Sequence, residues 1–119
     1  MAKTATLKIL IVDDHAAMRD VVKQLFADRD IAFVEAATGE EAVRHFAAEH
    51  PDWVIMDVRM PDLGGIRATQ AIRKLDPQAR VVAVSQFTGP DYRAAATAAG
   101  ALAFVNKEEL FQLRKIIQL

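Results

Sequence analysis

The 119-residue sequence contains no cysteine. Disulfide bonds, thiolate catalysis and zinc sites with cysteine ligands are therefore excluded. An excess of one charge is also absent, because 15 Lys and Arg residues stand against 16 Asp and Glu residues and the formal net charge is −1. This balance gives no electrostatic reason to expect direct binding of nucleic acid or of a membrane surface by this segment.

Long apolar runs are missing as well. No run approaches the ~20 residues that a membrane-spanning helix needs. The first residues, MAKTATLK, lack the apolar core of a signal peptide. We therefore expect a cytoplasmic protein without membrane contact. The length suits one compact domain over residues 1–119, and a hydrophobic content of 52% is enough for one buried core.

The sequence does contain five short apolar runs, at residues 7–12, 32–34, 53–56, 81–84 and 102–105. They are rich in β-branched or aromatic residues and are bounded by turn residues, which predicts strands buried on both faces. Each run is followed by a stretch with apolar residues at helical spacing, and this stripe is weak only in the alanine-rich stretch 92–99. Strict alternation of strands and helices predicts an α/β fold with a parallel sheet, right-handed crossovers and helices on both faces.

Residues at the expected helix ends agree with this pattern. Thr38 and Glu41 have the spacing of a capping box, with Thr38 as the N-cap of the second helix. Gly100 fits a left-handed cap after the alanine-rich helix. The last apolar stripe, from Leu110 to Ile117, predicts the core face of a fifth helix.

Polar side chains follow four of the five predicted strands: Asp13 and Asp14 after the first, Asp57 after the third, Ser85 after the fourth and Lys107 after the fifth. In an open α/β sheet, ligands bind beyond the carboxyl ends of the strands, at the point where the strand order reverses. If the first and third strands flank that point, three carboxylates meet there with a hydroxyl and an ammonium group beside them.

Three clustered carboxylates repel one another, and a divalent cation would relieve the repulsion. Mg2+ prefers oxygen ligands and often binds through one or two carboxylates and a phosphate. One carboxylate could then attack a phosphoryl donor and become an acyl phosphate, with Lys107 and Ser85 stabilising the phosphoryl oxygens. Each residue alone has an ordinary structural explanation, such as a turn or a solvated lysine. Their convergence on one edge of the sheet favours a magnesium-and-phosphate site.

The order and spacing of these residues resemble the receiver domain of bacterial two-component response regulators over about the whole chain. The matching residues are Ile11-Val12-Asp13-Asp14, Met56-Asp57-Val58-Arg59-Met60-Pro61, Gly64-Gly65, Ser85, Phe104 and Lys107. The Asp13-Asp14-His15 start and Lys107-Glu108 also resemble the subgroup that carries helix-turn-helix output domains and regulates transcription. The resemblance implies the flavodoxin-like (CheY-like) doubly wound fold, with five helices and a five-stranded parallel sheet of order 2-1-3-4-5.

The resemblance also implies a role for each acidic residue. Asp57 would be the phosphoacceptor. Asp13, Asp14, Asp57 and the backbone carbonyl of Arg59 would hold Mg2+, with Mn2+ as a substitute, Asp14 and Asp57 binding directly and Asp13 partly through water. His15, by contrast, is expected in the first turn of the following helix as a structural residue, and a ligand role is the less favoured interpretation.

The same resemblance implies a phosphorylation-dependent switch. Lys107 would pair with the phosphoryl group, Ser85 would move toward it, and Phe104 would turn into the space that Ser85 leaves. The donor would be a sensor histidine kinase or a phosphotransfer protein. The surface that changes would be formed by the fourth helix, the fifth strand and the fifth helix, and phosphorylation could produce a homodimer. Apart from its own phosphoryl transfer and slow autodephosphorylation, no enzymatic turnover is expected.

Three positions depart from the common family pattern. Glu108 follows Lys107 where a proline after a cis peptide bond is usual, so this bond could be cis or trans. Phe104 replaces a frequent tyrosine, and Gln86 stands where a small residue is usual. Gln86 and Arg59 could border the pocket and tune dephosphorylation, although a simply solvated Arg59 is an equal alternative.

Other functions are compatible with parts of the pattern. A receiver fold that acts as an interaction module without phosphorylation is the main alternative, supported only by the Lys107-Glu108 context. A haloacid-dehalogenase-type phosphatase would need a second Asp where Arg59 stands. A flavin-binding protein would need a phosphate loop after the first strand, where Asp13 and Asp14 would repel the phosphate.

Overall fold

The computed structural model describes residues 6–61, 64–86 and 90–117. Its centre is one parallel five-stranded sheet of order β2-β1-β3-β4-β5. The strands are β1 (Leu7–Val12), β2 (Ile31–Ala36), β3 (Trp53–Asp57), β4 (Val81–Ser85) and β5 (Ala103–Asn106). The α-helices are α1 (Ala16–Leu25), α2 (Gly39–Glu49), α3 (Gly64–Leu75), α4 (Pro90–Ala99) and α5 (Leu113–Ile116). The predicted fold class and strand order are confirmed.

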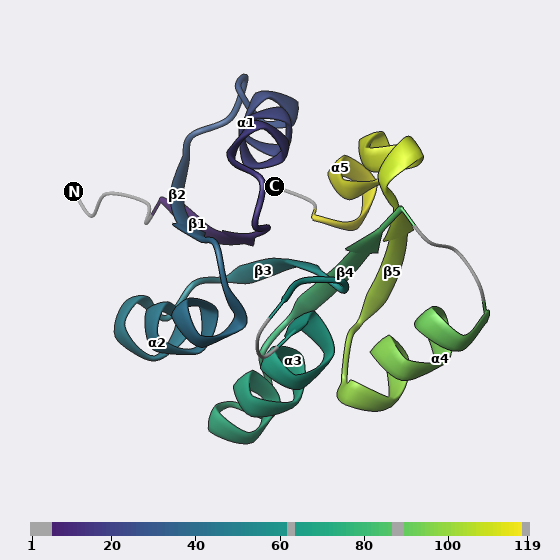
Figure 1. The fold of residues 1–119 in the computed structure, drawn as a ribbon. Helices are drawn as coiled ribbons and strands as arrows, with labels where there is room; N and C mark the ends of the chain where they lie inside the picture. Colours follow the sequence, from purple (N-terminus) through teal and green to yellow (C-terminus); the bar gives the residue numbers. More distant parts are fainter. Residues whose placement is uncertain (1–5, 62–63, 87–89, 118–119) are drawn as a thin grey trace.

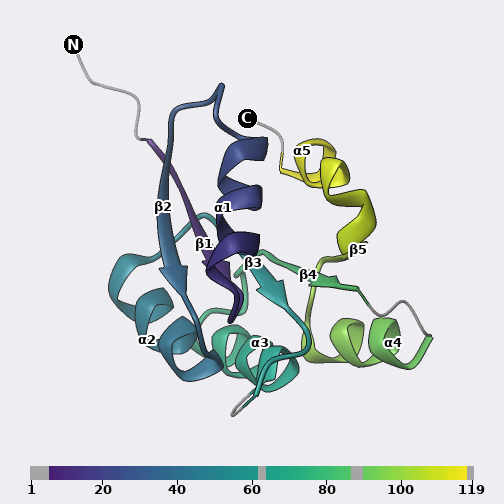
Figure 2. The same ribbon diagram turned by 45° about the horizontal axis from the view of Figure 1, so that its top comes forward.

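The helices cover the sheet from both faces. Helices α1 and α5 lie on one face, and α2, α3 and α4 lie on the other (Figures 1 and 2). Alternation along β1 explains how both layers are held, since successive side chains of a strand point to opposite faces. Ile9 and Ile11 belong to the core under α1 and α5, while Leu10 and Val12 belong to the core under α2 and α3.

Burial on both faces is confirmed for the central strands but is wrong for the edge of the sheet. Every residue of β3 and β4 is buried, whereas five of the six residues of β2 are only half-buried. Strand β2 has a neighbour on one side only, which leaves its side chains closer to solvent. Leu102, predicted within the fifth strand, precedes β5 and is 60% exposed.

The chain after β5 departs from the prediction of a single helix. A 3-10 helix spans Lys107–Gln112 before the short α5, and Glu109 inside it has non-helical backbone angles. The apolar stripe is nevertheless used as predicted, because Leu110, Leu113 and Ile117 are all buried. None of the helices among the described residues is long and apolar enough to cross a membrane.

The predicted helix caps are confirmed. The Thr38 side chain accepts a hydrogen bond from the backbone N–H of Glu41, and the Glu41 carboxylate accepts one from the N–H of Ala37 at 2.7 Å. Gly100 follows α4 with a φ of +109°. Both caps satisfy backbone groups that a helix end leaves without an intrahelical partner.

Two glycines begin α3 directly beside Asp57. Gly64 has a φ of +75°, a conformation that costs other L-residues strain, while a Cβ there would meet open space. A Cβ on Gly65 would overlap the backbone carbonyl of Asp57 and lie 2.8 Å from the Cα of Val58. Gly65 therefore allows α3 to begin against the end of β3, where the backbone carries Asp57.

We expect Gly65→Ala to lower the free energy of unfolding by about 3 kcal/mol or more, because rigid backbone atoms must move. Gly64→Ala should cost about 1 kcal/mol, because only the positive φ is unfavourable. Urea denaturation of both variants measures the difference. Equal losses in the two variants would contradict the steric role of Gly65.

Candidate functional site

The carboxyl ends of three neighbouring strands bring Asp13, Asp57 and Ser85 to one edge of the sheet. Asp13 follows β1, Asp57 ends β3 and Ser85 ends β4, and these strands pair directly in the order β1-β3-β4. All three side chains belong to residues that are at most 4% exposed. Asp14, the next residue along the chain, is exposed. In the order β2-β1-β3-β4-β5 the direction of strand addition reverses between β1 and β3, which is where the predicted site requires it.

Lys107 reaches this edge from the end of β5. Its Nζ lies 2.9 Å from Oδ2 of Asp13 and 3.4 Å from Oδ2 of Asp57. The peptide bond between Lys107 and Glu108 is trans. The missing proline therefore does not remove Lys107 from the site. The Asn106 side chain holds the following turn by accepting a 2.9 Å hydrogen bond from the N–H of Glu108.

Backbone contacts fix the two buried carboxylates further. Oδ1 of Asp13 accepts a hydrogen bond from the N–H of His15, and its backbone carbonyl accepts one of 2.7 Å from Nη1 of Arg19. Oδ1 of Asp57 accepts a 3.2 Å hydrogen bond from the N–H of Arg59. Each carboxylate thus uses one oxygen toward the backbone and turns the other toward Lys107.

The charges in this cluster are not balanced. Burial raises the pKa of Asp57 to about 6, and the attraction of Lys107 opposes this rise while the negative charge of Asp13 adds to it. Burial also disfavours the charged form of Lys107, but its hydrogen bond to Asp13 and the attraction of Asp57 outweigh it and raise the Lys107 pKa. One ammonium group therefore serves two buried carboxylates, and a second cation would stabilise them.

His15 is closer to the acidic cluster than the sequence interpretation assumed. It precedes α1 as the N-cap residue, and its side chain is 75% exposed. Its Nδ1 lies 3.1 Å from Oδ1 of Asp14 and 3.4 Å from Oδ1 of Asp13, and the three residues each offer a ligand atom within 4.8 Å of the others. Its position beside two aspartates was the sequence signal for this placement.

A pocket of about 250 Å3 opens beside Asp57. It is lined by His15, Asp57, Arg59, Ser85, Gln86 and Lys107. Arg59 and Gln86 are exposed, so they flank the opening, whereas Ser85 and Asp57 are buried. The structure therefore brings the predicted phosphoacceptor, hydroxyl, ammonium and both suggested tuning residues into one pocket.

The donor set suits a hard divalent cation. Asp13, Asp14 and Asp57 offer carboxylate oxygens, and the pKa of Asp57 is raised mainly by burial and further by the negative charge of Asp13. Mg2+ takes oxygen ligands, retains several waters and needs few protein groups. The residues present thus fit Mg2+, and the same carboxylate oxygens suit Mn2+.

Phe104 lies outside this pocket, on the β5 and α4 side of the sheet. It is half-buried against Val58, Ala83 and Ala96. The guanidinium carbon of Arg93 in α4 lies 4.9 Å from the centre of its ring. The predicted inward movement of Phe104 would therefore break a cation–π contact with α4.

A doubly wound α/β sheet with a polar pocket at the point where its strand order reverses is typical of ligand-binding domains, and sequence comparison identifies the family. The family model for the response regulator receiver domain matches residues 9–118, so the chain belongs to this family. The chemotaxis protein CheY of Bacillus subtilis is 36% identical over 112 residues, which cover 93% of this chain and 92% of that protein. Two-component signalling is therefore the general role of this domain.

Solved structures agree. A two-component response regulator of the LuxR family from Aurantimonas sp. SI85-9A1 has a TM-score of 0.84 at 36% identity, covering 95% of this chain and 85% of that chain. The CheX-CheY-BeF3-Mg2+ complex from Borrelia burgdorferi has a TM-score of 0.83 at 26% identity, covering 95% of this chain and 90% of that one. The fold of this chain is thus that of known receiver domains.

The burial of Asp57 beside Asp13 predicts a pH-dependent stability in Mg2+-free buffer. Because the folded-state pKa of Asp57 is raised from 3.8 to about 6, the wild type loses stability as the pH rises through this interval and retains the penalty above it. Asp57→Asn carries no charge at any pH. We expect it to be more stable than the wild type at pH 8 by about 2–3 kcal/mol, and by about half as much at pH 5.

Urea denaturation at the two pH values measures this difference. Asp30→Asn, which removes an exposed aspartate outside the pocket, is the matched control and should show no such gain. An Asp57→Asn variant with the same stability as the wild type at pH 8 would contradict the proposed charge imbalance.

Proposed function

We propose that this chain is a phosphorylation-dependent switch that accepts a phosphoryl group on Asp57. The observation that carries the proposal is the position of the Asp57 carboxylate, which is buried at the end of β3, 3.4 Å from Nζ of Lys107, and opens into a pocket shared with Ser85. A nucleophilic carboxylate next to groups that can bind phosphoryl oxygens is what acyl phosphate formation requires.

The transfer step balances without any redox partner. A carboxylate oxygen of Asp57 forms a bond to phosphorus, and the bond between phosphorus and the donor's histidine nitrogen breaks, its electron pair returning to the imidazole. Lys107 and the hydroxyl of Ser85 then stabilise the phosphoryl oxygens by charge-assisted hydrogen bonds. For this, Lys107 exchanges part of its pairing with Asp13 and Asp57 for the phosphoryl group.

Asp13, Asp14, Asp57 and the backbone carbonyl of Arg59 are the groups proposed to hold Mg2+, with Mn2+ as a substitute. The bound cation would neutralise the negative charge that gathers as donor phosphate and carboxylate approach each other. The complex from Borrelia burgdorferi, whose title names BeF3 and Mg2+, supports this assignment for a related receiver. Arg59 and Gln86 flank the opening, where their side chains would tune dephosphorylation by contacting the phosphoryl group or by limiting the access of water.

The donor would be a sensor histidine kinase or a phosphotransfer protein, and the domain would act as a cytoplasmic signalling component. It would not turn over external substrates. A segment of the autoinducer 1 sensor kinase/phosphatase LuxN of Vibrio campbellii is 40% identical over 81 residues, which cover 68% of this chain and 10% of that protein, and it supports a place in kinase signalling. Phosphorylation would alter the surface of α4, β5 and α5, which could support homodimer formation.

Incubation with acetyl phosphate should add one phosphoryl group to the wild type only when Mg2+ is present. Asp57→Asn should gain none, because the amide is not a nucleophile comparable to a carboxylate. Mass spectrometry of the intact protein measures both. Asp30→Asn is the control for loss of an exposed aspartate, and it should react like the wild type.

A wild type that gains no phosphoryl group would sink the proposal and leave the alternative of an interaction module. Modification of Asp57→Asn to the same extent would instead locate the acceptor at another residue.

The α4 helix is the element proposed to move when Phe104 turns inward. It buries only Ala96 and Ala99, whereas α2 buries the large side chain of Phe46 together with Gly39 and Ala42. Burial of small side chains stabilises a helix less than burial of an aromatic ring. Helix α4 is therefore held against the sheet by fewer apolar contacts of its own side chains.

Hydrogen exchange should reveal this difference in the unphosphorylated protein. We expect the backbone amides in the middle of α4 to exchange about tenfold faster or more than those of α2, relative to their unstructured rates. Exchange followed by NMR measures both helices in one sample. Equal protection of α4 and α2 would contradict the assignment of α4 as the mobile element.

A further inference from the structure

Helix α3 carries three cationic side chains and no acidic one. These are Arg67, Arg73 and Lys74, within a helix of 12 residues. The chain as a whole is almost neutral, with a formal net charge of −1. Positive charge is therefore concentrated on α3, outside the pocket of Asp57.

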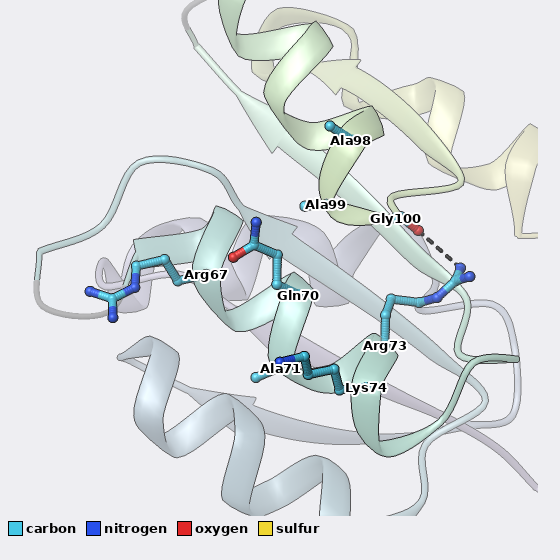
Figure 3. Close-up of a pocket in the computed structure, with 8 residues that line it drawn as sticks. All are labelled: Arg67, Gln70, Ala71, Arg73, Lys74, Ala98, Ala99 and Gly100. Carbon is cyan, nitrogen blue, oxygen red and sulfur yellow. Dashed lines mark hydrogen bonds between the residues drawn. The ribbon is translucent and has the colours of Figure 1, made fainter.

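These side chains border a groove between α3 and α4, with a volume of about 760 Å3 (Figure 3). The α3 wall includes Arg67, Gln70 and Lys74, and the α4 wall includes Ala98 and Ala99. In Figure 3, the Gln70 amide points toward α4, while Lys74 lies along the surface of α3. No acidic residue contributes to the part of this lining that the structure describes. The polar side of α3 thus faces small side chains of α4 through Gln70, while the Arg67 guanidinium extends away from the α4 wall (Figure 3).

Arg73 fixes the end of the groove. Its Nη1 donates a 3.1 Å hydrogen bond to the backbone carbonyl of Gly100, next to the C-terminus of α4, where a positive charge also interacts favourably with the helix dipole. Its Nε is buried and has no hydrogen-bond partner among the described residues. A Cβ on Gly100 would lie 2.9 Å from Cγ of Arg73, so glycine is needed for this approach. Arg73 therefore positions α4 against α3.

Arg67 and Lys74 are free for an external partner. Both are exposed, and neither forms an ion pair within the described part of the chain. They are seven residues apart, which places them two turns apart on one side of α3 and about 10.5 Å apart along its axis. This is also the spacing of two acidic side chains seven residues apart on another helix.

The groove fits a helix better than a small ligand. It is open to solvent along its length, whereas small-molecule sites enclose most of their ligand's surface. Alanines on both walls, Ala71 and Ala98, permit a third helix to approach to the 8–10 Å usual for packed helices. Gln70 can hydrogen-bond to a polar group on that helix.

We propose that the α3–α4 groove is a docking site for an acidic amphipathic helix of a partner protein. Its apolar face would contact the alanines, and two carboxylates two turns apart would pair with Arg67 and Lys74. The groove shares no lining residue with the pocket of Asp57, so the partner can bind without blocking phosphorylation.

The test uses a fluorescent synthetic helix of about five turns, with an alanine-and-leucine face and two glutamates two turns apart. A second peptide has glutamine in place of both glutamates. Fluorescence anisotropy measures the Kd, and amide shifts in NMR spectra locate the contact. We expect saturable binding of the glutamate peptide, weakened by added salt, with shifts concentrated at residues 67–74 and 98–100.

Charge reversal separates specific pairing from general attraction. Arg67→Glu with Lys74→Glu should raise the Kd at least about tenfold. Arg44→Glu with Lys115→Glu is the matched control, because it changes the net charge equally on α2 and α5. It should raise the Kd by less than about threefold. Circular dichroism and urea denaturation show whether each variant remains folded.

Several outcomes would overturn the proposal: equal binding of the glutamine peptide, equal weakening in the control variant, or shifts centred elsewhere. Inorganic phosphate that produced the same shifts without the peptide would make the groove a small-anion site and would equally overturn the assignment to a protein helix. None of these measurements requires Mg2+ or phosphorylation, so their result is independent of the proposed switch.

Discussion

The structure depends on one ammonium group shared by two buried carboxylates. Lys107 comes from the end of β5, Asp13 from the end of β1 and Asp57 from the end of β3, so their contacts connect strands that are distant in sequence. One positive charge compensates two negative charges incompletely, and burial raises the pKa of Asp57 to about 6. This residual charge makes the pocket receptive to a second cation, and a cation in turn attracts phosphate.

The same arrangement suits a switch. A phosphoryl group adds negative charge and acceptor oxygens next to Lys107 and Ser85. Any change that follows is limited to the difference in interaction energy between the two conformations. The contacts that hold Phe104 in place are modest, since it packs mainly against small apolar neighbours and makes one cation–π contact with Arg93. A few new hydrogen bonds at the pocket are therefore comparable in strength to what they must displace.

Helix α3 contacts both the backbone of Asp57 and the groove beside α4, although the Asp57 pocket and this groove have no lining residue in common. Its first turn packs against the backbone of Asp57 through Gly65, and its last turn holds the end of α4 through Arg73. Its exposed cations lie on a surface that neither the core nor the phosphorylation pocket uses. The proposed phosphorylation site and the proposed docking surface therefore lie at different places along the same helix and share no lining residue.

The sequence alone determined the fold class, the strand order implied by the family resemblance, and the capping roles of Thr38 and Gly100. The fold class and the caps follow from local patterns, namely apolar runs, helical periodicity and short-range hydrogen bonds. The strand order came from the family resemblance and not from any local pattern. Tertiary structure decided what depends on neighbours that are remote in sequence. The edge position of β2 left it half-buried. The chain after β5 forms a 3-10 helix over Lys107–Gln112, so the predicted fifth helix is α-helical only over Leu113–Ile116. Packing of the loops at the sheet edge decided two further points. It allowed Lys107 to reach Asp13 and Asp57 from a trans peptide bond, and it placed the exposed His15 ring beside Asp14. The cationic groove had no sequence signal beyond scattered Arg and Lys residues. It exists only because the sheet places α3 and α4 side by side on one of its faces.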